Sequence, residues 1–311
     1  MSVSADYLLD RRRLSRQLTV WRAIAFGVAA LALIALGLRF GGYRLGVGGD
    51  HVAKLRISGL ITGDDATVAA LREIGKSGAR AVILDIDSPG GTTAGSERLY
   101  NEIRRLAAKK PTVAVVGALG ASGAYITALA ADRIFVRETS LVGSIGVLAQ
   151  FPNVSGLLDK FGVKYETIKS SPLKAVPNGL EPTSDAARAA IAAVIDDSFA
   201  WFKALVRERR GMSDDELARV DDGRIFTGRQ SLPLKLADAF GGEREAEAWL
   251  TANKGLPKDL PMRDYSPGSG LAGFTLKSLG GGPLSVLWRA FGGEGGSVDG
   301  LVSIWQMSAG N

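Results

Sequence analysis

Residues 79–91 read ARAVILDIDSPGG, and residues 111–132 read PTVAVVGALGASGAYITALAAD. The first stretch opens with a continuous apolar run, which is the pattern of a strand buried on both faces of a sheet. The second opens with a similar run and continues, beyond a glycine-rich turn, into a helical pattern. Strand–turn–helix units of this kind are the building blocks of an α/β protein.

The alternation of strand and helix extends outward from these two stretches and sets the fold class. It begins with a strand over residues 52–59 and reaches a strand over residues 132–136. A β-α-β-α-β-α-β succession predicts an α/β fold with a largely parallel sheet and right-handed crossovers. Farther along, the pattern predicts a strand over residues 163–170, a long helix over residues 184–210, and shorter helices over residues 214–220, 228–237 and 243–253.

The net charge of +6 comes partly from an arginine cluster near the N-terminus. The cluster, Arg11, Arg12, Arg13 and Arg16, precedes an apolar run over residues 23–38. No zinc-finger, recognition-helix or RNA-stacking signature accompanies it, so we expect no nucleic-acid partner. Basic residues ahead of an apolar segment instead predict a cytoplasmic N-terminus followed by a membrane crossing. A cleaved signal peptide is the competing interpretation, because the run is short and rich in alanine.

These features divide the chain into five predicted parts. A basic cytoplasmic leader over residues 1–19 precedes a transmembrane anchor over residues 20–40 and a tether over residues 41–51. The folded domain extends over residues 52–254, on the far side of the membrane from the N-terminus. A glycine-rich C-terminal extension over residues 255–311 is expected to be flexible.

The turn after the second apolar run contains a candidate nucleophile. Ser122 stands there at the start of a helix and at the carboxyl end of a strand, where α/β proteins place their chemistry. The small residues around it leave room for a substrate chain. They define a predicted substrate cleft formed by Gly120, Ala121 and Gly123. Alternatively, Ser122 is only the N-cap of that helix.

The other glycine-rich turn, SPGG at residues 88–91, follows the first apolar run. Successive backbone N–H groups at a strand end are what an oxyanion hole requires, so Gly90 and Gly91 are candidate oxyanion residues. An ordinary strand-to-helix turn is the alternative. Two such turns at the ends of buried strands favour their convergence on one cleft.

A serine nucleophile needs a base, and the composition narrows the choice. The chain has no cysteine, which excludes thiolate nucleophiles and cysteine-ligated metals. Its one histidine, His51, lies at the start of the first strand, which argues against a Ser-His-Asp triad. A lysine can act instead when it is desolvated, because burial disfavours the charged form. Lys174, flanked by prolines and apolar residues, is the candidate, and Lys169 is the alternative.

Several motifs together resemble the signal peptide peptidase A family in its short bacterial form. They are SPGG at residues 88–91, GASGAYITALAAD at 120–132, GSIGV at 143–147, the lysine loop, and TGRQ at 227–230. The resemblance covers roughly residues 52–250, and it implies a crotonase/Clp-protease-like β-α-β superhelix with a largely parallel sheet. Two positions depart from the family pattern. Ala175 follows Lys174 where many members have an aspartate, and Lys235 stands where a glycine is common.

The resemblance also implies roles for particular residues. Ser122 matches the family's nucleophile, Lys174 its general base, and Ser144 the serine that orients the lysine. Gly90 and Gly91 match the oxyanion site, with the Ser122 amide as a second donor. A Ser-Lys serine endopeptidase of this kind is expected to need neither a metal nor a cofactor.

The implied protein is a membrane-anchored peptidase that hydrolyses extended apolar peptides, such as cleaved signal peptides. It would span the bacterial inner membrane once, hold its catalytic domain on the extracytoplasmic side, and assemble into a homo-oligomeric ring. Three alternatives stand beside it. They are a crotonase-like acyl-CoA enzyme, a non-catalytic membrane scaffold on the same fold, and a protease that cleaves stomatin-like membrane proteins.

Overall fold

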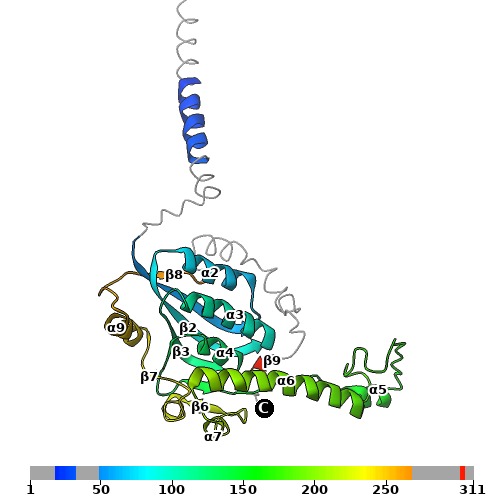
Figure 1. Ribbon diagram of the computed structural model, residues 1–311. Helices are drawn as coiled ribbons and strands as arrows, with labels where there is room; N and C mark the ends of the chain where they lie inside the picture. The colour runs from blue at the N-terminus through cyan, green and yellow to red at the C-terminus, as the bar shows by residue number, and fades with distance from the viewer. Residues whose placement is uncertain (1–17, 33–48, 268–301, 305–311) are drawn as a thin grey trace, which may run out of the picture. The chain divides into compact units, whose positions relative to one another are not determined.

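The computed structural model describes residues 18–32, 49–267 and 302–304 (Figure 1). The chain divides into two units, Met1–Gly49 and Asp50–Asn311. Residues 18–32 of the first unit form a helix. Among the described residues, no helix has both the length and the apolar character that crossing a bilayer requires. The leader through residue 17, and the remainder of the predicted anchor and tether at residues 33–48, lie outside the described residues.

The second unit is built on a sheet whose centre is the apolar stretch quoted first (Figure 1). There, β2 (Ala79–Thr92) pairs in parallel with β1 (His51–Ile61) on one side and with β3 (Thr112–Ala121) on the other. The described strands follow the order β6-β5-β3-β2-β1-β8, while β4 also pairs with β3, β7 with β4, and β9 with β2. The remaining bounds are β4 (Arg133–Val136), β5 (Leu141–Gly143), β6 (Ile225–Thr227), β7 (Ala239–Phe240), β8 (Met262–Asp264) and β9 (Val302–Ile304).

Most of these pairings are parallel. Within the described sheet, only β6 on β5 and β9 on β2 run antiparallel to their neighbours. The predicted α/β fold with a largely parallel sheet is therefore confirmed.

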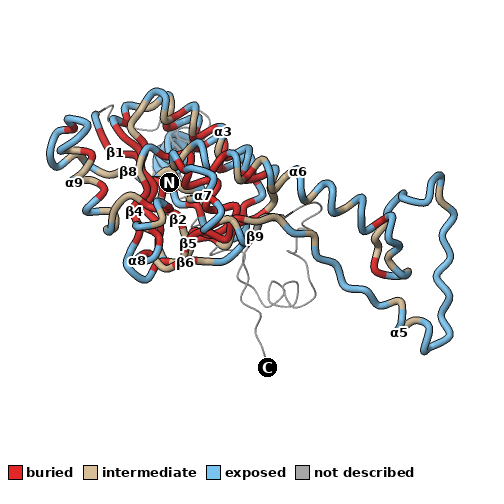
Figure 2. The backbone as a smooth tube through the Cα atoms, turned by 60° about the horizontal axis from the view of Figure 1, so that its bottom comes forward, coloured by how far each residue is buried: buried red, intermediate tan, exposed pale blue. Residues whose placement is uncertain are grey.

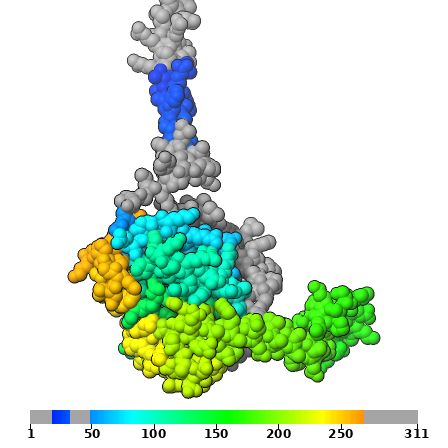
Figure 3. All heavy atoms as spheres, in the orientation of Figure 1, coloured from blue at the N-terminus to red at the C-terminus, as the bar shows by residue number. Residues whose placement is uncertain are grey.

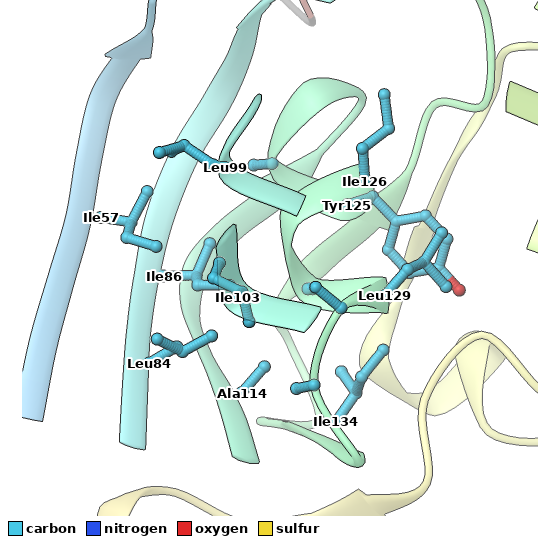
Figure 4. Packing of buried hydrophobic residues seen from close by; sticks show 14 of the residues in the cluster. Ile57, Leu84, Ile86, Leu99, Ile103, Ala114, Tyr125, Ile126, Leu129 and Ile134 are labelled. Carbon is cyan, nitrogen blue, oxygen red and sulfur yellow. The ribbon is translucent and has the colours of Figure 1, made fainter. Parts of the chain in front are cut away.

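Helices cover both faces of the central strands, which explains why β2 begins as a continuous apolar run. On one face, Leu84 and Ile86 pack with residues of α3 and α4 (Figure 4). Successive side chains of a strand point to opposite faces, so Ile83 lies on the other face, in a second cluster with Leu250 of α9. The helix bounds are α2 (Asp65–Lys76), α3 (Thr93–Ala107), α4 (Gly123–Leu129), α5 (Ser155–Lys160), α6 (Asp185–Arg210), α7 (Asp214–Leu217), α8 (Gly228–Ser231) and α9 (Glu243–Lys254).

Residues 148–194, which we call the arm, leave this packed body between β5 and the middle of α6. The arm carries α5 and the first part of α6, and Figures 2 and 3 show it projecting from the domain with most of its residues exposed. The second half of α6 returns to the core, where Phe202 and Val206 are fully buried. The predicted long helix is confirmed, with the Ser184 side chain accepting a hydrogen bond from the Ala187 N–H as its N-cap.

Three local predictions need correction. Residues 163–169 form no strand, because the arm offers them no sheet edge to pair with, and Ile168 is fully exposed. The helix predicted over residues 214–220 ends at Leu217. The helix predicted over residues 228–237 ends at Ser231, and Lys235 beyond it adopts a φ of 58°, which no α-helix accommodates.

Two strands lie beyond the predicted end of the folded domain at residue 254. Strand β8 pairs with β1, and β9 pairs with β2. Part of the predicted extension therefore belongs to the sheet. The rest of it, residues 268–301 and 305–311, lies outside the described residues.

Replacing Ile86 by alanine should lower the free energy of unfolding by about 2–5 kcal/mol, because this fully buried side chain would leave a cavity in the core. Denaturant titration followed by circular dichroism measures the loss. Ile168→Ala is the matched control, since the same atoms are removed from an exposed side chain, and a change within about 0.5 kcal/mol is expected. Equal losses for the two variants would contradict the packing described above.

Candidate active site

Ser122 lies in a tight turn between the end of β3 and the start of α4. Its backbone has a φ of 57° and a ψ of −119°, a combination that residues with a side chain rarely adopt. The residue is buried, its N–H donates to the Gly143 carbonyl at 2.8 Å, and its carbonyl accepts from the Ile126 N–H at 3.0 Å. The side chain makes no capping hydrogen bond to α4. Because strained backbone clusters at functional sites, these observations favour a nucleophile over an N-cap.

The helix that follows Ser122 is anchored by Tyr125. This residue is fully buried and lies beside Ile126 and Leu129 in the core (Figure 4). Its hydroxyl donates to the Leu236 carbonyl at 2.8 Å. Burial raises the pKa of Tyr125 above its ordinary value, so the hydroxyl remains a donor at physiological pH. This contact fixes the start of α4, which directly follows Ser122.

Ser144 is brought to the same edge of the sheet as Ser122. Strand β3 pairs in parallel with β5 through Gly120↔Val142 and Ala121↔Gly143, so the residues that follow, Ser122 and Ser144, end neighbouring strands. Ser144 is buried, has a φ of 51°, and donates its N–H to the Arg224 carbonyl at 2.8 Å. Two serines in left-handed turns therefore meet at one strand edge.

Gly90 and Gly91 lie on the other side of β3, where β2 passes alongside it with Ser88 opposite Gly120. The Ser88 side chain is fully buried, donates to the Gly59 carbonyl at 2.6 Å and accepts from the Gly90 N–H at 3.1 Å. A Cβ added to Gly91 would lie 1.9 Å from the Ile61 carbonyl oxygen, so this position admits no side chain. No role was predicted for Ser88 from the sequence. Its position between a buried apolar run and Pro-Gly-Gly was the sequence signal that could have identified it.

Two backbone donors expected at the oxyanion site are already engaged. The Gly90 N–H donates to Ser88 Oγ, and the Ser122 N–H donates to the Gly143 carbonyl. The expectation that the Ser122 amide serves as an oxyanion donor is therefore wrong, because an N–H bonded within the sheet is not directed at a substrate.

The small residues around Ser122 pack inside the domain. Gly120, Ala121 and Gly123 are all buried, and a Cβ on Gly120 would approach a methyl group of Val116 to 2.8 Å. Their small size lets β3 and α4 pack closely in this turn. The substrate cleft expected at these residues stays a prediction.

Lys174 does not lie beside Ser122 within the chain. It belongs to the arm, which Figure 1 shows extending away from α4, and its side chain is exposed. The adjacent Leu173 and Ala175 are exposed too, so the desolvation expected for a lysine base is not provided within one chain, and the role of Lys174 stays a prediction. Lys169, the alternative base, is held in the same arm by an ion pair with Glu181.

The edge beside Gly90 and Gly91 pairs with an extended segment of the same chain. Strand β9 lies antiparallel to it through Gly90↔Ile304, Gly91↔Ser303 and Thr92↔Val302. This edge is therefore able to align a peptide backbone next to the strand that ends at Ser122. In the described part of the chain, no group of three or more His, Asp or Glu side chains is placed to hold a metal ion.

Comparison with known proteins places these features in a protein family. The model of peptidase family S49 matches residues 104–257. A relative from Synechocystis, provisionally named a protease, is 33% identical over 210 residues, which cover 67% of this chain and 76% of the relative. The provisionally named signal peptide peptidase SppA of Enterococcus faecium is 30% identical over 65% of this chain and 58% of its own length. The chloroplastic serine protease SPPA of Arabidopsis thaliana is 32% identical over 57% of this chain and 26% of its own length.

Solved structures with a similar fold share little sequence with this chain. A membrane-bound stomatin-specific protease is 15% identical and matches 70% of this chain and 98% of its own, with a TM-score of 0.48. ClpP1 from Listeria monocytogenes is 13% identical over 62% of this chain and 93% of its own, with a TM-score of 0.41.

Gly91→Ala should disturb both the fold and the site, because the new Cβ would overlap the Ile61 carbonyl and push β1 away from β2. We expect a lower melting temperature and a loss of peptide hydrolysis of about tenfold or more, as misplacement at an active site produces. Gly75→Ala is the matched control. Its Cβ would have 3.8 Å of clearance in α2, so a stability gain of about 0.5–1 kcal/mol with unchanged hydrolysis is expected. An unperturbed Gly91→Ala would show that this close approach is unimportant.

Proposed function

The chain belongs to peptidase family S49, and on this premise we propose that it is a membrane-anchored serine endopeptidase with Ser122 as nucleophile and Lys174 as general base. The observation that carries the proposal is the strained, uncapped turn at Ser122, beside a strand edge that already aligns an extended segment. Membership of a peptidase family favours this function over an acyl-CoA enzyme or a scaffold.

We propose that Lys174 acts on the Ser122 of a second copy of the chain. A lysine takes a proton from serine only as a neutral amine, the form that removal of water favours. The arm that carries Lys174 also exposes many large apolar side chains. These are Leu148, Phe151, Val154, Leu157, Phe161, Val163, Tyr165, Ile168, Leu173, Leu180 and Val194.

An apolar surface of this extent is typical of an interaction site. Packing of the arm against another copy would cover these side chains and remove water from Lys174, which favours its neutral form. The proposed assembly is thus a homo-oligomeric ring in which neighbouring copies complete each other's sites.

The proposed reaction is acyl transfer. Ser122 Oγ attacks the carbonyl carbon of the scissile peptide bond while its proton passes to the neutral amine of Lys174, and Ser144 orients that amine. The C–N bond then breaks as the lysine returns the proton to the leaving nitrogen. A water molecule, deprotonated in the same way, cleaves the acyl ester and restores the serine. The Gly91 and Gly123 N–H groups are the proposed oxyanion donors, in place of those of Gly90 and Ser122.

We propose that the substrate is an extended, mainly apolar peptide. The pairing of β9 with Gly90–Thr92 supports this, because a substrate strand that takes the place of β9 at this edge would make similar backbone hydrogen bonds. The residues around Ser122 are small or apolar and carry no charge. Cleaved signal peptides have this chemistry, and so do membrane-proximal segments of other proteins. One relative in the family carries a signal peptide peptidase name.

We also propose that residues 20–40 anchor the protein in the bacterial inner membrane, with the catalytic domain outside the cytoplasm. Residues 18–32 are helical, and the apolar sequence continues through residue 38. The arginine cluster ahead of them supports a cytoplasmic N-terminus.

Ser122→Ala and Lys174→Ala should each reduce hydrolysis of an unstructured apolar reporter peptide by about a thousandfold or more, because each removes one half of the dyad. Mixing the two inactive variants before assembly should restore part of the activity, since some sites then combine an intact Ser122 with an intact Lys174. Peptide turnover and the mass of the assembly are the measurements.

Lys164→Ala is the matched control for the lysine variant, because it removes another exposed lysine from the same arm and should leave turnover unchanged. Full activity of Lys174→Ala would exclude it as the base. Assembled mixtures without recovered activity would place both catalytic residues in one copy.

Deleting residues 1–49 should release the protein from isolated membranes without removing its peptidase activity, because the second unit contains Ser122 and Lys174. Carbonate extraction of membranes, followed by immunoblotting and the peptide assay, provides the measurement. A truncated chain that still resists extraction would contradict the proposed anchor.

A further inference from the structure

Strand β3 changes partner just before it reaches Ser122. It pairs with β4 through Val113–Val116 and with β5 through Leu119–Ala121. Its register with β2 shifts at the same place, between Ile86 and Ser88. In the described sheet, Gly117 and Ala118 consequently lie opposite no residue of β2, β4 or β5. Beyond such a gap, β3 could pair with β5 in more than one register. Only the observed register places Ser122 in its turn.

Two side chains bond the backbone of this gap. Asp87 Oδ1 accepts a hydrogen bond from the Leu119 N–H at 3.1 Å. On the other side, Ser140 Oγ donates to the Gly117 carbonyl at 2.6 Å and accepts from the Arg137 N–H at 2.9 Å. Backbone groups without a strand partner need such substitutes, because an unbonded N–H or carbonyl inside a protein is costly.

Gly117, at the gap, lies in close contact with the carboxylate of Asp87. A Cβ added to Gly117 would lie 3.3 Å from Asp87 Oδ2, so the side chain of Asp87 rests directly against the bare Cα of this residue. Asp87 therefore contacts the gap twice, at the start through Gly117 and at the end through Leu119.

We propose that Asp87 is a positioning residue for Ser122, and that its Oδ1 fixes the point at which β3 joins β5. Ser122 lies three positions beyond Leu119, and extended backbone transmits a displacement over this length of about 10 Å. The Ser122 N–H bonds to Gly143 of β5, so the serine is in register only when β3 joins β5 at Leu119. This inference rests on the proposed role of Ser122 as nucleophile.

The negative charge of Asp87 and its role as a hydrogen-bond acceptor can be considered separately. Asp87 lines a cavity of 360 Å³ together with the charged residues Lys54, Arg56, Asp85, Arg137 and Glu243. In the described part of the chain, Lys54 pairs with Asp85 and Glu243, and Arg56 pairs with Asp85, whereas Asp87 forms no ion pair. What Asp87 contributes is thus a hydrogen-bond acceptor at a fixed place, and an uncharged acceptor at that place should serve equally well.

The test separates the acceptor from the charge in the full-length, assembled protein. Asp87→Asn keeps Oδ1 and removes the charge, while Asp87→Glu keeps the charge and moves the acceptor by one methylene. The measurements are the rate of covalent labelling of Ser122 by a fluorophosphonate, kcat and KM for the reporter peptide, and the melting temperature. Asp85→Glu is the matched control, because it lengthens a carboxylate in the same cavity that bonds no β3 amide.

Asp87→Asn should stay within about threefold of wild type. Asp87→Glu should lose about tenfold or more in both labelling rate and kcat, with KM within about twofold. A displacement of the nucleophile by up to about one ångström has an effect of this size on the rate. Asp85→Glu should behave as wild type. Should Asp87→Glu fail to fold, Asp87→Ser, which withdraws the acceptor without adding volume, carries the same expectation.

Wild-type labelling and turnover in Asp87→Glu and Asp87→Ser would overturn the inference, and so would an Asp87→Asn variant as impaired as Asp87→Glu. The proposed function fails separately, and the inference with it, if wild type is not labelled or if Ser122→Ala is still labelled.

Discussion

The hydrogen bond from the Ser122 N–H to the Gly143 carbonyl joins the two strand ends on which the candidate site is built. It requires β3 to have left β4 and to run beside β5, and it requires Ser122 to adopt a positive φ. Ser144 follows Gly143 directly, so the same bond brings the two serines to one edge. Every other feature of the site, from the close approach of Gly91 to Ile61 to the anchoring of α4 by Tyr125, maintains the strands that make this bond.

Polar side chains, two of them buried and that of Asp87 half-buried, bond the backbone where the regular pairing of the sheet ends. Ser88 bonds the Gly59 carbonyl and the Gly90 N–H, Ser140 bonds the Gly117 carbonyl, and Asp87 bonds the Leu119 N–H. Asp87 and Ser88 stand at the register shift between β2 and β3, and Ser140 stands in the turn between β4 and β5. Parallel strands that end in catalytic turns need irregular backbone, and these side chains allow that irregularity inside a packed domain.

The arm separates the candidate base from the candidate nucleophile within one copy of the chain. The sheet holds the candidate nucleophile rigidly, while the candidate base lies on an exposed, apolar projection. Such an arrangement suits an enzyme that becomes active only on assembly. A free copy would hold Ser122 without its base, and hydrolysis would be confined to rings in which Lys174 is covered by a neighbouring copy.

Much of this protein was predictable from local sequence. The continuous apolar run at residues 79–86 specifies a strand buried on both faces, and the Gly-Ala-Ser-Gly turn marks Ser122, because burial and turn chemistry act over a few neighbouring residues. Family membership followed from motifs of the same kind. Local pattern misassigned residues 163–170, where a stretch of β-branched, aromatic and charged residues forms no strand because no sheet edge lies beside it.

Only the tertiary structure decided which backbone donors are engaged, that the small residues near Ser122 are buried, and that Lys174 lies away from Ser122 in its own chain. Those properties depend on partners far apart in sequence, such as Gly143 for Ser122, and no pattern in either segment records the pairing. The sequence determined the candidate catalytic residues, and the fold determined which of them lie together.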